Sequence, residues 1–201
     1  MKRKTFFISP SKIKFCIYPS KFCDYTQFEL KKNHPHAGVN RGVFDQDLSG
    51  NVKFINTSWD KKPGVLFTSL LEFIALKNHI NGKENWKRSI FAKRNINYIK
   101  KNNSVRGFTD HRKYLINREK QIDKLINSII KKGILEKKNN SKNKINDNIS
   151  VVLTKNLQLY FNNRGHHRLS IAKILGINNI PVQIVVAKTK KILNEFHTTV
   201  I

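Results

Sequence analysis

The sequence has few of the residues that mark secreted or membrane proteins. It contains two cysteines, Cys16 and Cys23, in 201 residues, so it lacks the paired cysteines of a disulfide-stapled secreted domain. The longest apolar run, 65–76, is interrupted by Glu72 and is shorter than the roughly 20 residues that a membrane span needs. The apolar segment 6–8 is too short for a signal peptide. We therefore expect a cytoplasmic protein with no membrane partner.

Acidic residues are also scarce. The chain has 13 Asp and Glu against 39 Lys and Arg, which gives a formal net charge of +26. The cations are 30 lysines and only 9 arginines, spread among 24 asparagines and 24 isoleucines. This bias is typical of an AT-rich coding sequence, whereas proteins that read nucleic acid usually cluster arginines, which fork onto bases and phosphates. The charge favours a solvated basic surface and leaves non-specific nucleic-acid binding as an alternative.

The chain contains enough apolar sequence for a folded domain of the α/β (α+β) class. Hydrophobic residues make up 39% of it and aromatic residues 10%. Turn residues and short apolar runs in 1–60 predict one or two short strands in a loop-rich arm. Apolar spacing predicts an amphipathic helix over 65–80 that ends at Asn81–Gly82, and a weaker helix over 86–100.

The strongest helix signal lies between Asn117 and Gly133. Apolar side chains between them recur at positions i, i+3, i+4 and i+7, so we expect Asn117 to cap the helix and Gly133 to end it. The Lys/Asn/Ser tract 136–148 has almost nothing to bury and predicts a mobile loop.

The last fifty residues predict strand, turn, strand, tight loop, helix and strand. A hairpin joins 149–153 to 157–161, a helix covers 166–175, and alternate residues of the strand 180–186 share one face. Pro181 suits an edge strand or the start of a strand. The expected organisation is a loop-rich and helical region over 1–109, an α/β domain over 110–190 and a tail over 191–201.

The tight loop before the predicted helix carries the clearest chemical signal. Gly165 permits a sharp backbone turn, and the helix after it offers unpaired N–H groups and the positive end of its dipole to an anion. Cations are unfavourable at a helix N-terminus, and such a conflict is typical of a functional site. The predicted phosphate-binding residues, with no metal ligand among them, are Arg164, Gly165, His166, His167 and Arg168.

Residues 165–176, Gly-His-His-Arg-Leu-Ser-Ile-Ala-Lys-Ile-Leu-Gly, and the Ile-Pro-Val that starts at Ile180 resemble a known domain. They are similar to the nucleotide-binding domain shared by ParB partition proteins, sulfiredoxin and the free-serine kinases. Residues 122–133 resemble the helix that precedes the phosphate loop in that family, so the resemblance spans about 117–188. It implies a ParB/sulfiredoxin-like small mixed sheet with flanking helices.

The resemblance further implies that Gly165, His166, His167 and Arg168 line the triphosphate of ATP or CTP, with Mg²⁺ between the phosphates. The loop also departs from each relative. His166 stands where sulfiredoxin has its catalytic cysteine, so sulfinic-acid reduction is not expected. Partition proteins carry Glu-Arg-Arg after the glycine. Arg164 replaces the aspartate that precedes the Gly-His-Thr-Arg loop of the serine kinases.

Phosphotransferase or NTPase activity is left open, because phosphoryl transfer needs carboxylates for a metal and a general base. The acids nearest to the site in the sequence are Glu119, Asp123 and Asp147, and Asp123 is expected to face solvent. The alternative function is a non-enzymatic DNA-associated basic protein that uses the ParB-like fold. Only fifteen residues follow Val186, too few for the helix-turn-helix domain that follows in partition proteins. A third possibility is a scaffold that keeps the fold without the chemistry.

Two further groups of residues have simpler interpretations. The spacings Cys-x6-Cys and His-Pro-His are unlike those of zinc sites, so Cys16, Cys23, His34 and His36 are not expected to bind zinc. Trp59–Asp60 is similar to an element of ParB-like proteins without known activity, and Trp59 is expected to serve packing.

Overall fold

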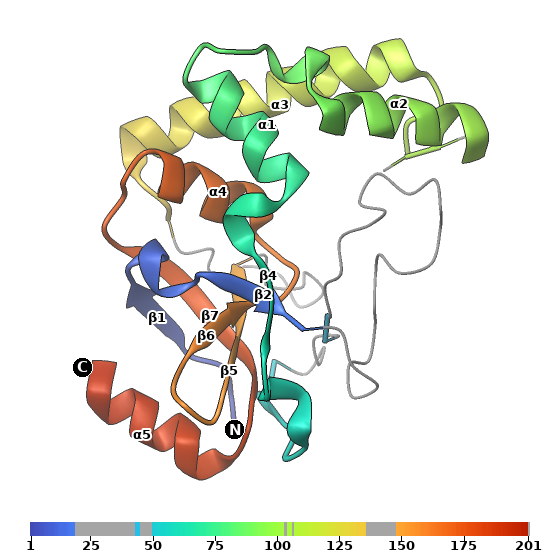
Figure 1. The fold of residues 1–201 in the computed structure, drawn as a ribbon. Helices are drawn as coiled ribbons and strands as arrows, with labels where there is room; N and C mark the ends of the chain where they lie inside the picture. Colours follow the sequence, from blue (N-terminus) through green and yellow to red (C-terminus); the bar gives the residue numbers. More distant parts are fainter. Residues whose placement is uncertain (19–42, 45–49, 103, 106, 136–147, 201) are drawn as a thin grey trace.

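The computed structural model describes residues 1–18, 43–44, 50–102, 104–105, 107–135 and 148–200 (Figure 1). Within these residues, seven strands form one mixed sheet and five α-helices pack around it. The strands are β1 (Thr5–Ile8), β2 (Phe15–Ile17), β3 (Lys53–Phe54), β4 (Pro63–Leu66), β5 (Ile149–Leu153), β6 (Leu159–Phe161) and β7 (Ile180–Ala187). The helices are α1 (Leu71–Ile80), α2 (Ile90–Asn102), α3 (His111–Lys132), α4 (His166–Ile174) and α5 (Lys190–Val200). The mixed α/β class predicted from the sequence is confirmed.

The sheet joins the two ends of the chain. Its order is β1-β7-β5-β6-β2-β4, and β3 pairs with the end of β7. The central strands β5 and β7 are parallel, and β5 and β6 form the predicted antiparallel hairpin. Strands β1 to β4 all come from residues before 67, so the sheet crosses the boundary drawn at 109/110. The N-terminal region supplies strands to the sheet because β7 and β6 otherwise present unpaired backbone groups at its edges.

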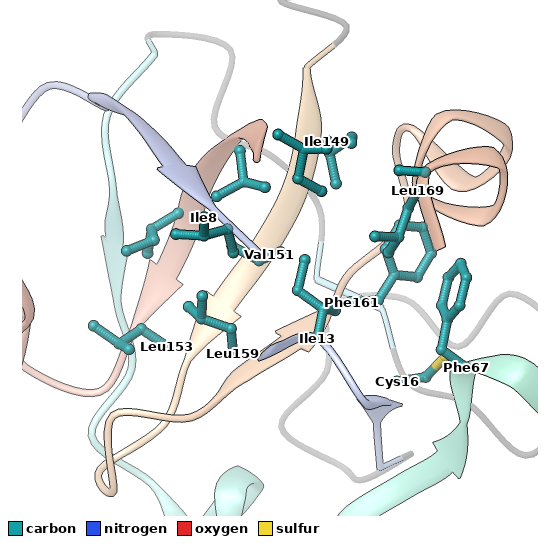
Figure 2. Close-up of a cluster of buried hydrophobic side chains, with 14 of the residues drawn as sticks. Ile8, Ile13, Cys16, Phe67, Ile149, Val151, Leu153, Leu159, Phe161 and Leu169 are labelled. Atoms are coloured by element: carbon teal, nitrogen blue, oxygen red, sulfur yellow. The ribbon is translucent and has the colours of Figure 1, made fainter. Parts of the chain in front are cut away.

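The main core lies on the face of the sheet that α4 covers. Figure 2 shows Ile149, Val151 and Leu153 of β5 projecting to this side, with Leu169 of α4 nearby. Alternation places Val152 on the opposite face, as a strand with a two-residue repeat requires. The second cluster on that face contains Ile17, Phe44, Trp59, Val152, Tyr160, Val185 and Val186.

One part of the predicted β7 pattern is wrong. Ile180, Val182 and Ile184 do pack in the main core, but Val186 belongs to the cluster on the other face. The pairing of β7 with β5 shifts register between Ile184 and Val186. The extra residue is a β-bulge, which reverses the side on which the following side chains project. Pro181 is the second residue of β7, so the prediction that it lies at a strand start is confirmed.

Two predicted helix starts are wrong. α1 begins at Leu71 because residues 63–66 form β4, although its predicted end at Asn81 is confirmed. α3 begins at His111, and Asn117 lies inside it. The cap is Asp110, whose carboxylate accepts hydrogen bonds from the backbone N–H of Arg112 at 2.7 Å and of Lys113 at 3.2 Å. The apolar stripe marked only part of the buried side of α3, because Tyr114, before Asn117, is also buried in a core cluster.

The outcomes for the segments after α3 and β7 are mixed. The prediction that Gly133 ends α3 is confirmed, and its φ is +65°. The tail expected over 191–201 is helical as far as Val200, because α5 buries Leu193 and Phe196 in the main core. Of the predicted loop 136–148, residues 136–147 lie outside the described residues, and Asn148 is buried. No helix of the described chain combines the length and the apolar character of a membrane span.

The Trp59–Asp60 element holds the N-terminal region to the sheet. Trp59 packs on Phe44 with its ring centroid 5.3 Å away, and its indole N–H donates to Ile55 O at 2.9 Å. Asp60 is buried and accepts hydrogen bonds from Lys188 Nζ at 2.6 Å and from the backbone N–H of Lys155 at 2.8 Å. Burial raises the pKa of Asp60, but these hydrogen bonds outweigh it and hold that pKa below the ordinary value.

We predict that Asp60→Asn lowers the free energy of unfolding at pH 7 by about 3 kcal/mol, because it leaves Lys188 half-paired in a buried position. The folded carboxyl has the lower pKa, so its contribution is present above the unfolded pKa of about 3.9 and is lost as pH falls further. Urea unfolding at pH 7 and pH 3 measures both effects. Asp110→Asn is the control, since Asn caps a helix as well as Asp. The prediction is contradicted if the difference in free energy of unfolding between wild type and Asp60→Asn is the same at pH 3 as at pH 7.

Candidate functional site

The predicted glycine turn exists and is shaped by close packing. It links β6 to α4, and Gly165 precedes the helix with φ +80° and ψ +18°. A Cβ built at Gly165 would lie 2.7 Å from Cγ1 and 2.8 Å from Cα of Ile149. The left-handed backbone and the contact with β5 therefore both require glycine at this position.

Buried polar groups anchor the rest of the turn. The Ser150 hydroxyl accepts from the backbone N–H of Asn163 at 3.3 Å and of Arg164 at 2.9 Å. The Ser150 N–H donates to Arg164 O at 3.1 Å. The side chain of Asn162 accepts from Phe44 N–H at 2.9 Å and donates to Phe44 O at 2.8 Å. These bonds fix the backbone from which the site side chains project.

A carboxylate from α1 meets the two histidines of the turn. Glu72 lies in the first turn of α1, and its side chain is 3% exposed. Its Oε1 lies 2.6 Å from His167 Nε2, and its Oε2 lies 3.2 Å from His166 Nδ1. The His166 ring also packs on Phe67, with the ring centroids 4.9 Å apart. One buried carboxylate thus orients both imidazoles.

An arginine from α3 completes the group. Arg118 Nη2 lies 2.8 Å from His167 Nε2, and its Nη1 donates to Gln121 Oε1 at 3.1 Å. The Nε2 atom of His167 is therefore close to both a carboxylate and a guanidinium. Helices α1, α3 and α4, which are far apart in the sequence, meet at this position (Figure 1).

The two arginines of the turn have different environments. Arg168 is 9% exposed within α4. Arg164 is half-buried, and its guanidinium makes no hydrogen bond or ion pair with the described part of the chain. The five predicted residues thus lie together, and the site gains Glu72 and Arg118. Among these residues, Arg164 carries a positive charge that has no acidic partner in the described part of the chain.

The acids noted in the sequence are used elsewhere. Glu119 pairs with Lys87 at 2.6 Å. Burial raises the pKa of Glu119, but the hydrogen bond and the positive charge of Lys87 outweigh it and hold that pKa below the ordinary value. Asp123 is half-exposed, and its Oδ1 lies 2.8 Å from His79 Nε2. Because His79 Nδ1 accepts from Trp86 N–H at 3.2 Å, its Nε2 carries the proton toward Asp123. Asp147 lies outside the described residues.

The prediction that the two cysteines and the His-Pro-His pair do not bind zinc remains untested. Cys16 is buried in the main core, and Cys23, His34 and His36 lie outside the described residues. The described residues contain no group of three His, Cys, Asp or Glu side chains that is able to hold a metal ion.

Sequence reasoning missed Glu72, Arg118, Ser150 and Asn162. Glu72 had a signal, because it is the one charge in the most apolar run of the chain. A charge in such a run has to be paired when the run is buried. Arg118, Ser150 and Asn162 had no comparable signal, since their partners are distant in the sequence.

Comparison with known proteins gives no relative. No protein-family model matches the chain, and no curated protein and no solved structure is similar to it.

We predict that Glu72→Gln lowers the free energy of unfolding by about 2 to 3 kcal/mol, because it removes a buried charge from its two imidazole neighbours. Glu119→Gln is the matched control. It breaks a partly exposed pair, so we expect a loss of about 1 kcal/mol or less. Chemical denaturation of both variants tests this, and equal losses contradict it.

We also predict that Gly165→Ala costs about 2 kcal/mol more stability than Gly176→Ala. Both glycines have positive φ, so both variants pay the left-handed backbone penalty. Only at Gly165 does the new methyl group overlap Ile149, since nothing lies within 4 Å of a Cβ at Gly176. Urea unfolding of the pair isolates the contact with β5. Similar losses would show that the turn has room to relax.

Proposed function

We propose that the turn Gly165–Arg168 binds the phosphate groups of a nucleoside triphosphate, such as ATP or CTP, or of a similar ligand. The observation that carries this proposal is the guanidinium of Arg164, which has no hydrogen bond or ion pair in the described part of the chain and lies beside the N-terminus of α4, where the first backbone N–H groups have no partner within the helix. Electropositive side chains at such a position are unfavourable for folding unless an anion neutralises them.

Arg164 is the residue best placed to meet a ligand. Its backbone is fixed by Ser150 at both its N–H and its C=O, so the side chain starts from a rigid point. A guanidinium held in this way forks onto phosphate oxygens without first giving up an ion pair in the described part of the chain. His166 and His167, oriented by Glu72, add donors beside it.

The residues do not fit a magnesium ion held by the protein. Mg²⁺ prefers carboxylate oxygens, and Glu72 is already held by two imidazoles. The described residues contain no group of three or more His, Cys, Asp or Glu side chains that could hold a metal ion. The arrangement therefore supports binding of phosphate groups, and the proposal includes no transfer step. A ParB/sulfiredoxin-like fold, suggested by the motif from Gly165 to Gly176, is part of the same proposal.

We expect ATP or CTP at a concentration of about ten times its dissociation constant to stabilise the protein by about 1.4 kcal/mol, which raises the melting temperature by about 3 to 6 °C. The monophosphate, with fewer charged oxygens, gives a smaller shift. Differential scanning fluorimetry with each nucleotide, with and without Mg²⁺, measures this. Absence of any shift at millimolar nucleotide refutes the proposal.

We expect Arg164→Gln to weaken nucleotide binding at least tenfold and to leave the melting temperature of the free protein unchanged, because it removes a charge-assisted hydrogen bond to the ligand only. Arg88→Gln, an exposed arginine beside α2, is the control and keeps wild-type binding. Arg168 is a poorer probe, since truncation of a buried arginine also removes packing. Equal binding by both variants places the ligand elsewhere.

A further inference from the structure

The exposed side of α3 carries a straight row of lysines. Lys113, Lys120, Lys124 and Lys131 are all exposed. At about 100° per residue, spacings of 7, 11 and 18 positions place the four within about 20° of one line along the helix. The row is about 27 Å long at 1.5 Å per residue. We name these four residues the lysine row.

The opposite side of α3 explains why the row points outward. Tyr114, Ile122 and Ile129 are buried on the side that packs on α1, α4 and the residues around Trp86. The row lies roughly across the helix from them, so the four ammonium groups face solvent. Figure 1 shows α3 at the end of the molecule away from α5.

The acids of α3 do not offset these charges. Glu119 and Asp123 are turned toward Lys87 and His79, with which they pair. The four lysines make no ion pair with the described residues. An ordinary solvated helix face mixes both signs of charge, whereas the neighbours within the row are Asn117 and Asn127, which are exposed and neutral.

The start of α3 also carries an excess of basic residues, although they destabilise this end of the helix. His111, Arg112 and Lys113 occupy its first turn, and no acidic residue is present there. Cations at this end oppose the helix dipole, and only the Asp110 cap compensates them. A partner that brings negative charge to this face would relieve that conflict.

We propose that the lysine row binds the phosphate backbone of double-stranded nucleic acid without sequence preference. Lysine is a point charge suited to phosphate, whereas base recognition usually relies on the fork of arginine. The row has no exposed aromatic side chain on which unpaired bases stack, so a duplex suits it better than a single strand. Asn117 and Asn127 add donors to phosphate or sugar oxygens. The surface is separate from the Gly165–Arg168 turn.

The test is the salt dependence of binding to a 20-base-pair duplex of random sequence, measured by fluorescence anisotropy between 50 and 200 mM salt. The row variant is Lys113→Gln, Lys120→Gln, Lys124→Gln and Lys131→Gln. Each lysine–phosphate contact contributes about 0.9 to the slope of log affinity against log salt. We expect the row variant to lose 3 to 4 units of slope and about tenfold or more in affinity at 100 mM salt.

Two further variants separate the row from charge in general. The control Lys61→Gln, Lys155→Gln, Lys190→Gln and Lys191→Gln removes the same charge from exposed positions outside α3, and we expect its slope to change by less than 1 unit. The four Lys→Arg changes in the row retain duplex binding. Melting temperatures close to wild type show that all variants are folded.

Equal losses in the row and control variants overturn the proposal, because binding would then follow net charge alone. So does a wild-type chain that fails to bind the duplex. A single strand of equal length that competes more strongly than the duplex also overturns it, as does a preference of a hundredfold for one duplex sequence.

Discussion

The buried carboxylate of Glu72 is the constraint on which the arrangement of helices α1, α3 and α4 depends. A charge that is 3% exposed is costly unless it is paired, and its partners here come from α4 through His166 and His167. Arg118 brings α3 to the same point through His167. The three helices are thus tied together by one electrostatic group, which also sets the orientation of the rings at the glycine turn.

The turn itself is fixed from the opposite side by the sheet. Ile149 leaves no space for a side chain at Gly165, and Ser150 holds the backbone on either side of Arg164. The turn is therefore held in place by β5 on one side and by the helices on the other. This gives a physical reason why binding of a ligand there would require little rearrangement of the backbone, which is the condition under which charge-assisted hydrogen bonds to phosphate are most effective.

Local patterns in the sequence predicted the C-terminal part of this arrangement well. The hairpin of β5 and β6, helix α4 and strand β7 each have a period and turn residues that act over a few positions. The same is true of Gly165, whose place between a strand and a helix indicated its function in the turn. The bulge before Val186 was not predictable, because it depends on how β7 pairs with β5 rather than on the residues of β7.

Features that depend on distant partners escaped prediction. The start of α3 lies six residues before the predicted start at Asn117, since its first turn is held by the Asp110 cap. Residues 1–60 were expected to form a loop-rich arm with one or two short strands, but the residues before 67 supply β1 to β4 to the sheet. Short segments with few periodic residues become strands only when an edge is available to pair with them. The places of Glu72 and Arg118 in the site could not be predicted without knowing which helices meet there.

Arginine and lysine have different uses in this chain, which helps to separate its composition from its function. The arginines near the turn, Arg118, Arg164 and Arg168, are all at least half-buried, where a guanidinium keeps its charge. The lysines of the row are exposed and keep their hydration. A compositional bias toward lysine adds such residues freely on a surface. It does not by itself place four of them on one line of a helix whose acids pair with residues of other elements. The positions of the cations therefore carry more information about partners than the net charge of +26 does.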